Sequence, residues 1–187
     1  MKKLILFASG AGSNAEAIAN FLETDENIDI VSVFTNNENA GVIDRMDELG
    51  IDVRVFDADE LALGEITQEL EFLDPDLIVL AGFLLKIPED LVAKFPNRIV
   101  NIHPALLPKF GGKGMYGKKV HQAVFDAKEA ESGISIHYVN EQYDEGKIIA
   151  QYKVDVSACQ SPAEIEQKVR QLELTHYPQV IAELLQS

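Results

Sequence analysis

Cysteine is almost absent from this 187-residue chain, which contains a single one, Cys159. One thiol cannot form an internal disulfide, so the sequence favours a reducing compartment and implies no thiol chemistry. Long apolar runs are also lacking. The run Leu4–Ala8, behind the basic start Met1-Lys2-Lys3, is too short for a signal sequence or a membrane span. We therefore expect a cytoplasmic protein with no membrane partner.

Positive charge is scarce. The chain has 16 Lys and Arg residues against 31 Asp and Glu residues, for a formal charge of −15. Such a surface repels phosphodiester backbones, so we expect no nucleic-acid partner. One segment is an exception, because it combines lysine with glycine: Lys109, Gly111, Gly112, Lys113, Gly114, Gly117, Lys118 and Lys119. Its composition leaves open whether it is a solvated surface loop or a loop that covers a ligand.

Motifs for metal binding and for serine hydrolysis are missing too. The sequence has no HxH, HExxH or Cys/His cluster, so we expect no metal. A Ser-His-Asp arrangement can be drawn with Ser13 or Ser135, but no G-x-S-x-G elbow supports it.

What the chain does contain is the pattern of an α/β protein. Its 47% hydrophobic and 25% charged residues are ordinary for one well-buried domain over 1–187. Short apolar runs alternate with helix-length segments, which predicts a Rossmann-like, mostly parallel twisted sheet flanked by helices. The predicted strands are Lys3–Ala8, Ile28–Thr35, Asp52–Phe56, Leu77–Ala81, Arg98–Ile102, Gly133–Val139 and Ile148–Val154. A short turn joins the last two, which predicts an antiparallel C-terminal extension.

The predicted helices lie between these strands and at the end of the chain: Asn14–Glu23, Gly41–Leu49, Leu61–Leu73, Glu89–Lys94, Lys118–Ala127 and Ser161 to about Leu185. Ser161-Pro-Ala-Glu164 is a capping sequence for the last helix, with proline in the first turn and glutamate at the third position.

A glycine-rich segment, Ser9-Gly-Ala-Gly-Ser-Asn14, follows the first predicted strand and opens the first helix. Bare helix-terminal N–H groups there can face an anion. The segment also fits G-x-G-x-x-G/A, but a dinucleotide site needs an acidic residue at the end of the second strand. The sequence there is Phe34-Thr-Asn-Asn37, with no carboxylate before Glu38. A site for a single phosphate therefore fits better than a nicotinamide site, and a purely structural turn remains an alternative.

The segment Asn101-Ile-His-Pro-Ala-Leu-Leu-Pro108, followed later by Asp144-Glu-Gly146, combines an amide, an imidazole and a carboxylate. Period-2 alternation points Asn101 and His103 to the same side of a strand. A histidine near a carboxylate can exchange a proton near neutral pH, and an amide can donate to an oxyanion. For the other three histidines, His121, His137 and His176, a structural role is favoured. His137 alternates with apolar residues in Ser135–Val139, so the polar stripe of that strand could line the site or simply face water.

Five segments together resemble the folate-dependent phosphoribosylglycinamide formyltransferase family: Ser9–Asn14, Leu80–Phe83, Asn101–Pro108, Gly112–Gly117, and Asp144 with Gly146. The resemblance runs from Lys3 to about Ile181. It implies transfer of a formyl group from 10-formyltetrahydrofolate, acting as co-substrate, to the amine of phosphoribosylglycinamide in purine biosynthesis. It also implies small-molecule partners, and it leaves a monomer or a homodimer open.

The resemblance also implies roles for single residues. Asn101 would donate to the oxyanion, His103 would carry a proton, and Asp144 would raise the pKa of His103 and order a water. The phosphate and amine of the ribonucleotide would be held by Gly12, Ser13, Asn14 and Glu173. Folate would lie against Leu84, Leu85, Lys86 and Ile87, and against Asn140, Glu141, Gln142, Tyr143 and Asp144. The phosphate-binding half would span about 1–100, and the folate and catalytic half about 80–187.

Two departures from the family pattern affect the folate side. Many relatives have Gly-Gly-Pro after the aspartate, where this chain has Glu145-Gly-Lys147. An arginine common in the folate region is absent at Leu85, and Lys86 is the candidate to replace its contact with the folate glutamate tail.

Three alternatives use related chemistry. Methionyl-tRNA formyltransferase shares the His-Pro-x-Leu-Leu-Pro segment, but needs a further C-terminal domain and a basic surface. Formyltetrahydrofolate hydrolase carries a regulatory domain ahead of its catalytic half, whereas the first strand here begins at Lys3. A folate- or nucleotide-binding module without turnover would be favoured if His103 or Asp144 were misplaced.

Overall fold

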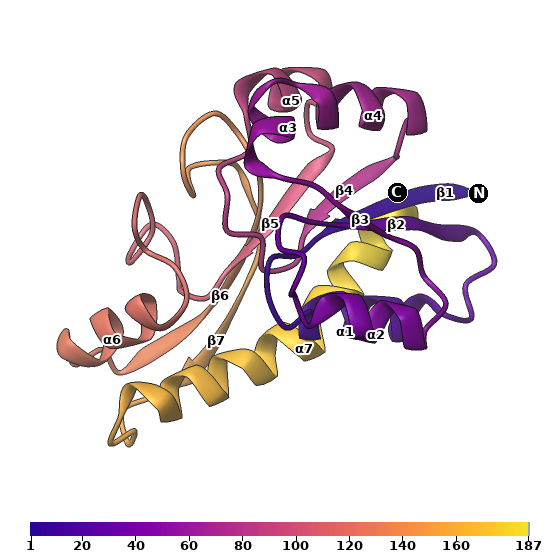
Figure 1. Cartoon of the computed structure of the whole chain (residues 1–187). Coiled ribbons are helices and arrows are strands. Elements are labelled where there is room, and N and C mark those ends of the chain that lie inside the picture. Colours follow the sequence, from indigo (N-terminus) through magenta and orange to yellow (C-terminus); the bar gives the residue numbers. More distant parts are fainter. Residues whose placement is uncertain (187) are drawn as a thin grey trace.

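The sheet of this protein has seven strands in the order β3-β2-β1-β4-β5-β6-β7, as seen in a computed structural model that describes residues 1–186 (Figure 1). The strands are β1 (Lys2–Phe7), β2 (Ile28–Thr35), β3 (Val53–Val55), β4 (Leu77–Leu80), β5 (Ile99–His103), β6 (Glu131–Tyr138) and β7 (Ile148–Asp155). The first five pair in parallel, and β6 and β7 are antiparallel. The predicted α/β class with an antiparallel extension is confirmed.

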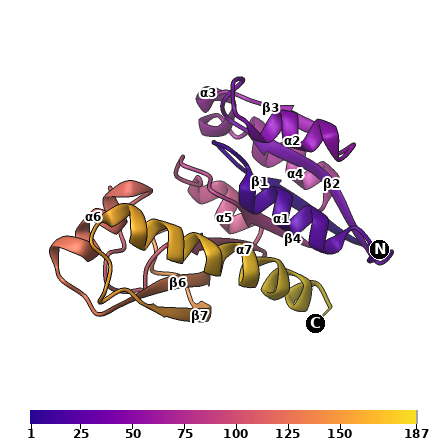
Figure 2. The same ribbon diagram turned by 90° about the horizontal axis from the view of Figure 1, so that it is seen from below.

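Helices cover both faces of the sheet (Figure 1). They are α1 (Ser13–Leu22), α2 (Val42–Glu48), α3 (Ala58–Ala62), α4 (Glu65–Leu73), α5 (Glu89–Lys94), α6 (Lys118–Asp126) and α7 (Pro162–Gln186). The 25-residue helix α7 contacts α6 along one part of its length and α1 along another (Figure 2). The predicted cap of α7 forms, since the Ser161 hydroxyl accepts the Glu164 N–H at 3.4 Å.

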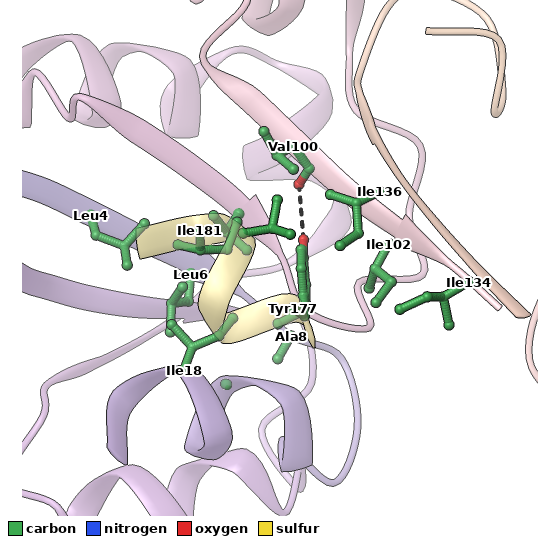
Figure 3. Close-up of a cluster of buried hydrophobic side chains, with 14 of the residues drawn as sticks. Leu4, Leu6, Ala8, Ile18, Val100, Ile102, Ile134, Ile136, Tyr177 and Ile181 are labelled. Atoms are coloured by element: carbon green, nitrogen blue, oxygen red, sulfur yellow. Dashed lines mark hydrogen bonds between the residues drawn. The ribbon is translucent and has the colours of Figure 1, made fainter. Parts of the chain in front are cut away.

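Alternate residues of β1 enter two separate cores, as expected for a parallel strand buried on both faces. Leu4 and Leu6 join the core under α1 and α7 (Figure 3), and Ile5 and Phe7 join the core under α4 and α5. All four side chains are fully buried. Because both faces are covered, ligands can approach only at the ends of the strands.

One predicted helix is wrong. The segment Leu61–Leu73 forms two helices, α3 and α4, because Gly64 has φ +81°, in the left-handed region that interrupts a helix. The first of these helices also begins earlier than predicted. Asp57 accepts the N–H groups of Asp59 and Glu60, and the Glu60 carboxylate accepts the Asp57 N–H in return.

Tyr177 connects α7 to the strand ends beneath the site. It is fully buried, and its hydroxyl donates to the carbonyl of Leu80 at 3.0 Å. The Val100 carbonyl lies 3.4 Å from the same hydroxyl, and this contact is the dashed line in Figure 3. Burial raises its pKa well above the usual tyrosine value, so the hydroxyl stays a donor at any physiological pH.

Removing that hydroxyl should destabilise the protein. Tyr177→Phe removes a buried hydrogen bond, so we expect a loss of about 1–2 kcal/mol in the free energy of unfolding, measured by urea denaturation. Tyr152→Phe is the matched control, since the Tyr152 ring packs on His176 and the core but its hydroxyl forms no hydrogen bond among the described residues. Equal losses in the two variants would contradict this role of Tyr177.

None of the helices within residues 1–186 combines the length and apolar character needed to cross a bilayer.

Candidate active site

A cavity of about 280 Å³ lies beyond the carboxyl ends of β4 and β5 and the start of α1. This is where the strand order reverses, because β1 has β2 on one side and β4 on the other. Open parallel sheets bind ligands at such a position, since the loops on the two sides diverge there. The cavity has three walls, which come from β5 with β6, from α1 with α7, and from the loops after β4 and β6.

Asn101 and His103 form the first wall, and both line the cavity as the alternation of β5 predicts. His103 is only 4% exposed. Its Nε2 lies 2.7 Å from the carbonyl of Phe110, which can only accept, so Nε2 carries the hydrogen. Its Nδ1 lies 3.5 Å from Oδ2 of Asp144. The predicted imidazole–carboxylate pair is therefore present, with Nδ1 as the nitrogen that exchanges a proton.

Asp144 reaches His103 from a tight turn. Its own φ is +57°, and the backbone approaches β6 so closely that a Cβ on Gly146 would lie 1.6 Å from the Tyr138 carbonyl oxygen. Only glycine fits there, which explains the Asp-x-Gly pattern. Oδ2 of Asp144 also accepts the Gly112 N–H at 2.9 Å. The lysine- and glycine-containing segment is thereby tied to the Asp144 carboxylate.

His137 is a site residue that the sequence analysis missed, since a structural role was favoured for it. It lies opposite Asn101 in the β5–β6 register and lines the cavity. Its Nδ1 donates to the Tyr138 carbonyl at 2.9 Å, which leaves Nε2 to accept from Nδ2 of Asn101 at 3.2 Å. Nε2 is also 3.6 Å from Oδ1 of Asp144. His137 therefore orients the Asn101 amide.

Burial lowers the pKa of His103 below its usual value. The Asp144 charge and the Phe110 carbonyl raise that pKa, as the sequence analysis expected of Asp144, but they only partly offset burial. For Asp144, burial raises the pKa, but the contacts with His137, His103 and the Gly112 N–H lower it more, so the carboxylate stays charged. Without Asp144 the pKa of His103 would be lower still, so Asp144 favours the imidazolium form of His103.

The second wall brings α1 and α7 together. Nδ2 of Asn14 donates to Oε2 of Glu173 at 3.2 Å, and both residues line the cavity. Burial raises the pKa of Glu173, and the Asn14 hydrogen bond partly offsets this. Within the described chain, Gly12 and Ser13 start α1 beside the cavity without lining it.

The third wall is formed by the loops after β4 and β6. Leu84, Leu85, Lys86 and Ile87 line it, as do Asn140, Gln142, Tyr143 and Asp144. Of the predicted set, Glu141 alone is not among the lining residues in the described chain. Nζ of Lys86 lies 5.8 Å from the centre of the Tyr143 ring, so the two loops meet across this wall.

The segment around Gly112–Gly117 covers part of the cavity, so the ligand-covering alternative is favoured over a plain surface loop. Gly112, Gly114, Met115, Tyr116 and Gly117 all line it. The lysines of this segment are not among the lining residues in the described chain, and Lys109 instead pairs with Glu129 at 2.8 Å. The alternative nucleophile Ser135 is fully buried and donates to the Ala105 carbonyl at 2.7 Å, which does not suit a hydrolase.

The sequence profile of the formyl transferase family matches residues 2–181, which is nearly the whole chain. The chain belongs to the formyl transferase family.

Individual formyl transferases resemble it along almost all of its length. Phosphoribosylglycinamide formyltransferase of Bacillus subtilis is 36% identical and aligns over 99% of this chain and 95% of its own. The chloroplastic enzyme of the same name from Arabidopsis thaliana is 43% identical over 96% of this chain. The chain spans 64% of that plant relative, and 61% of the one from Vigna unguiculata.

Solved structures show the same fold. Glycinamide ribonucleotide transformylase 1 from Geobacillus kaustophilus has a TM-score of 0.89 and 32% identity, covering 99% of each chain. Phosphoribosylglycinamide formyltransferase from Bacillus halodurans has a TM-score of 0.88 and 32% identity, covering 98% of this chain and 95% of that one.

A formyl transferase has to bring a formyl donor and an acceptor into contact, and residues of all three walls line this one cavity. Within residues 1–186, no three His, Cys, Asp or Glu side chains form a group that could hold a metal ion.

Proposed function

We propose that this formyl transferase moves the formyl group of 10-formyltetrahydrofolate to the amine of 5′-phosphoribosylglycinamide, a step of de novo purine biosynthesis. One observation carries the proposal: Asn101, His103, Asp144 and Glu173 all line a single cavity. An amide donor and an imidazole suit a developing oxyanion, and a carboxylate suits an amine. The names of the relatives from Bacillus subtilis and Arabidopsis thaliana support the same acceptor.

The reaction follows from these groups. The neutral amine attacks the formyl carbon, a C–N bond forms, and the carbonyl electrons move onto oxygen. Nδ2 of Asn101 and the imidazolium of His103 stabilise that oxyanion. The formyl oxygen takes the place of the Phe110 carbonyl as the acceptor of the Nε2 hydrogen of His103. Collapse of the intermediate breaks the bond to N10 of the folate. The proton lost by the attacking amine returns to N10 through His103 and a water ordered by Asp144.

The phosphate of the ribonucleotide is assigned to the start of α1, in the half of the chain that covers about 1–100. The first helical hydrogen bond there runs from the Glu16 N–H to the Gly12 carbonyl, at 2.9 Å. The N–H groups of Ser13 and Asn14 precede it, so they are free for an anion. Glu173 then accepts from the amine at the other end of the same ligand.

Folate is assigned to the third wall, in the half that covers about 80–187. Leu84, Leu85 and Ile87 supply an apolar slot for a flat heterocycle, and Lys86 supplies a cation for the glutamate tail. Backbone groups of Asn140–Asp144, including Glu141, would hold the pterin edge. Lys86 and Tyr143 already lie together at the rim of this slot.

Purified protein mixed with glycinamide ribonucleotide and 10-formyl-5,8-dideazafolate tests the function. Deformylation of the folate, followed by absorbance, should require the ribonucleotide. Release without the ribonucleotide would instead identify a hydrolase. If the folate binds tightly but is not deformylated with or without the ribonucleotide, the protein is a binding module.

The phosphate assignment can be tested at Gly12. A Cβ there would lie 2.5 Å from Cγ2 of Val42, and φ is +77°, so Gly12→Ala must displace the start of α1. We expect the KM for the ribonucleotide to rise about tenfold or more, and the KM for the folate to stay within about twofold, in steady-state kinetics.

Gly10→Ala is the matched control, because a Cβ at Gly10 meets nothing within 4 Å. Both KM values should stay close to wild type in this variant. A Gly12→Ala protein in which both KM values rise equally would remove the phosphate from this loop.

A further inference from the structure

The amide of Asn14 is placed at the junction of two parts of the site. Its backbone belongs to the first turn of α1, where the phosphate is assigned, and its side chain reaches across to α7 and donates to Glu173. Asn14 is 9% exposed, and both residues line the cavity. A single residue thus contacts both regions that the acceptor nucleotide would occupy.

We propose that Asn14 is a positioning residue, whose side-chain amide holds the Glu173 carboxylate in the orientation that receives the acceptor amine. The proposal rests on the function proposed above. It gives the two halves of Asn14 different tasks: the backbone N–H faces the phosphate, and the side chain acts on the amine only through Glu173.

The surroundings of Glu173 leave this task to Asn14. Among the described residues, Nδ2 of Asn14 is the one hydrogen-bond donor to the Glu173 carboxylate. Three other groups influence Glu173 or lie near it: Arg170, Glu166 and the neutral Tyr177 hydroxyl. None of the three forms a hydrogen bond or an ion pair with Glu173 in the described chain. A partly buried carboxylate with one donor takes its orientation from that donor.

The amide can adopt only one orientation while Glu173 is ionised. Turning it over would place Oδ1, which has no donor among the described residues, against the carboxylate oxygen. The site therefore accepts one unsatisfied amide oxygen, which is costly for a buried group. A residue with a purely structural role would be expected to have both ends of its amide satisfied.

Two variants separate the tasks of Asn14. Asn14→Ala removes the donor, and Asn14→Asp keeps the shape but sets a second carboxylate against Glu173. The KM for glycinamide ribonucleotide should rise about tenfold or more in both. The inhibition constant of ribose 5-phosphate, which has the phosphate but no amine, should stay within about threefold of wild type.

The pH dependence of kcat/KM distinguishes this role from a structural defect, because a structural defect would not shift it. The Asn14 hydrogen bond lowers the pKa of Glu173, so removing it raises that pKa. The acid limb of kcat/KM should then move to higher pH in Asn14→Ala. The profile of a variant destabilised in the other core, Leu70→Ala in the core under α4 and α5, should keep its acid limb in place.

A double-mutant cycle decides the proposal. If Asn14 acts only through Glu173, then adding Asn14→Ala to Glu173→Ala, which has no group left to accept the Asn14 amide, should change the KM for the ribonucleotide by less than about twofold. Independent effects that multiply, or an equal weakening of ribose 5-phosphate binding, would overturn it. The proposed function is tested separately by wild-type turnover, so loss of the wild-type reaction and failure of the cycle are distinct results.

Discussion

Alanine at His103 or at Asn101 should lower kcat about a hundredfold or more, with the KM of each substrate within a few-fold of wild type. In the proposed mechanism both residues stabilise charge that exists only in the transition state, so their loss should affect the chemical step and not ground-state binding. Single-turnover kinetics with saturating ribonucleotide and folate measures the effect. The expected loss corresponds to about 3 kcal/mol, as for one donor to an oxyanion.

His176→Ala is the control for these variants. His176 stacks on Tyr152 at 3.8 Å and is not among the lining residues of the described chain. Its kcat should stay within about twofold of wild type. Wild-type turnover in His103→Ala or Asn101→Ala would show that the reaction takes place elsewhere.

The first wall of the site was predictable because it depends on local geometry. The two-residue period of β5 places Asn101 and His103 on one side, and the structure lines the cavity with both. The glycine in the Asp-x-Gly pattern is equally local, since Gly146 is required where the turn touches β6.

His137 was missed for the opposite reason. Its place beside Asn101 depends on which residue of β6 pairs with which residue of β5, and this register joins positions 36 residues apart. Alternation within β6 shows only that His137 shares a face with Ser135. The partner strand decides that this face meets the cavity.

The predicted helix Leu61–Leu73, which is divided into α3 and α4, shows a third limit of prediction from the sequence. Apolar residues at Leu61, Ile66 and Leu70 all reach the core, so a hydrophobic pattern cannot distinguish one long helix from α3 and α4. The left-handed φ of Gly64 makes the break. Glu173 also had no local signal, because its role depends on α7 returning to α1, and only the family resemblance pointed to it.

Asp144→Asn should lower activity most strongly at alkaline pH. In the proposed mechanism the active form of His103 carries a proton, and Asp144 is the carboxylate whose charge favours that proton. Burial already lowers the pKa of His103, so removing the charge lowers it further. Activity that needs the imidazolium is present below this pKa and is lost as pH rises through it. The alkaline limb of the kcat profile should therefore move to lower pH.

The direction of that shift follows from the geometry. Oδ2 of Asp144 lies 3.5 Å from Nδ1 of His103, so loss of its charge lowers the pKa of His103, and turnover at pH 8 should fall about tenfold or more. Asparagine keeps an oxygen that can accept the Gly112 N–H, so the loop contact survives. NMR titration of His103, assigned against His137→Gln because His137 is also close to Asp144, measures the shift directly. If the pKa of His103 stays unchanged while the rate falls strongly, then Asp144 acts instead by ordering the water or the turn at Glu145-Gly146-Lys147.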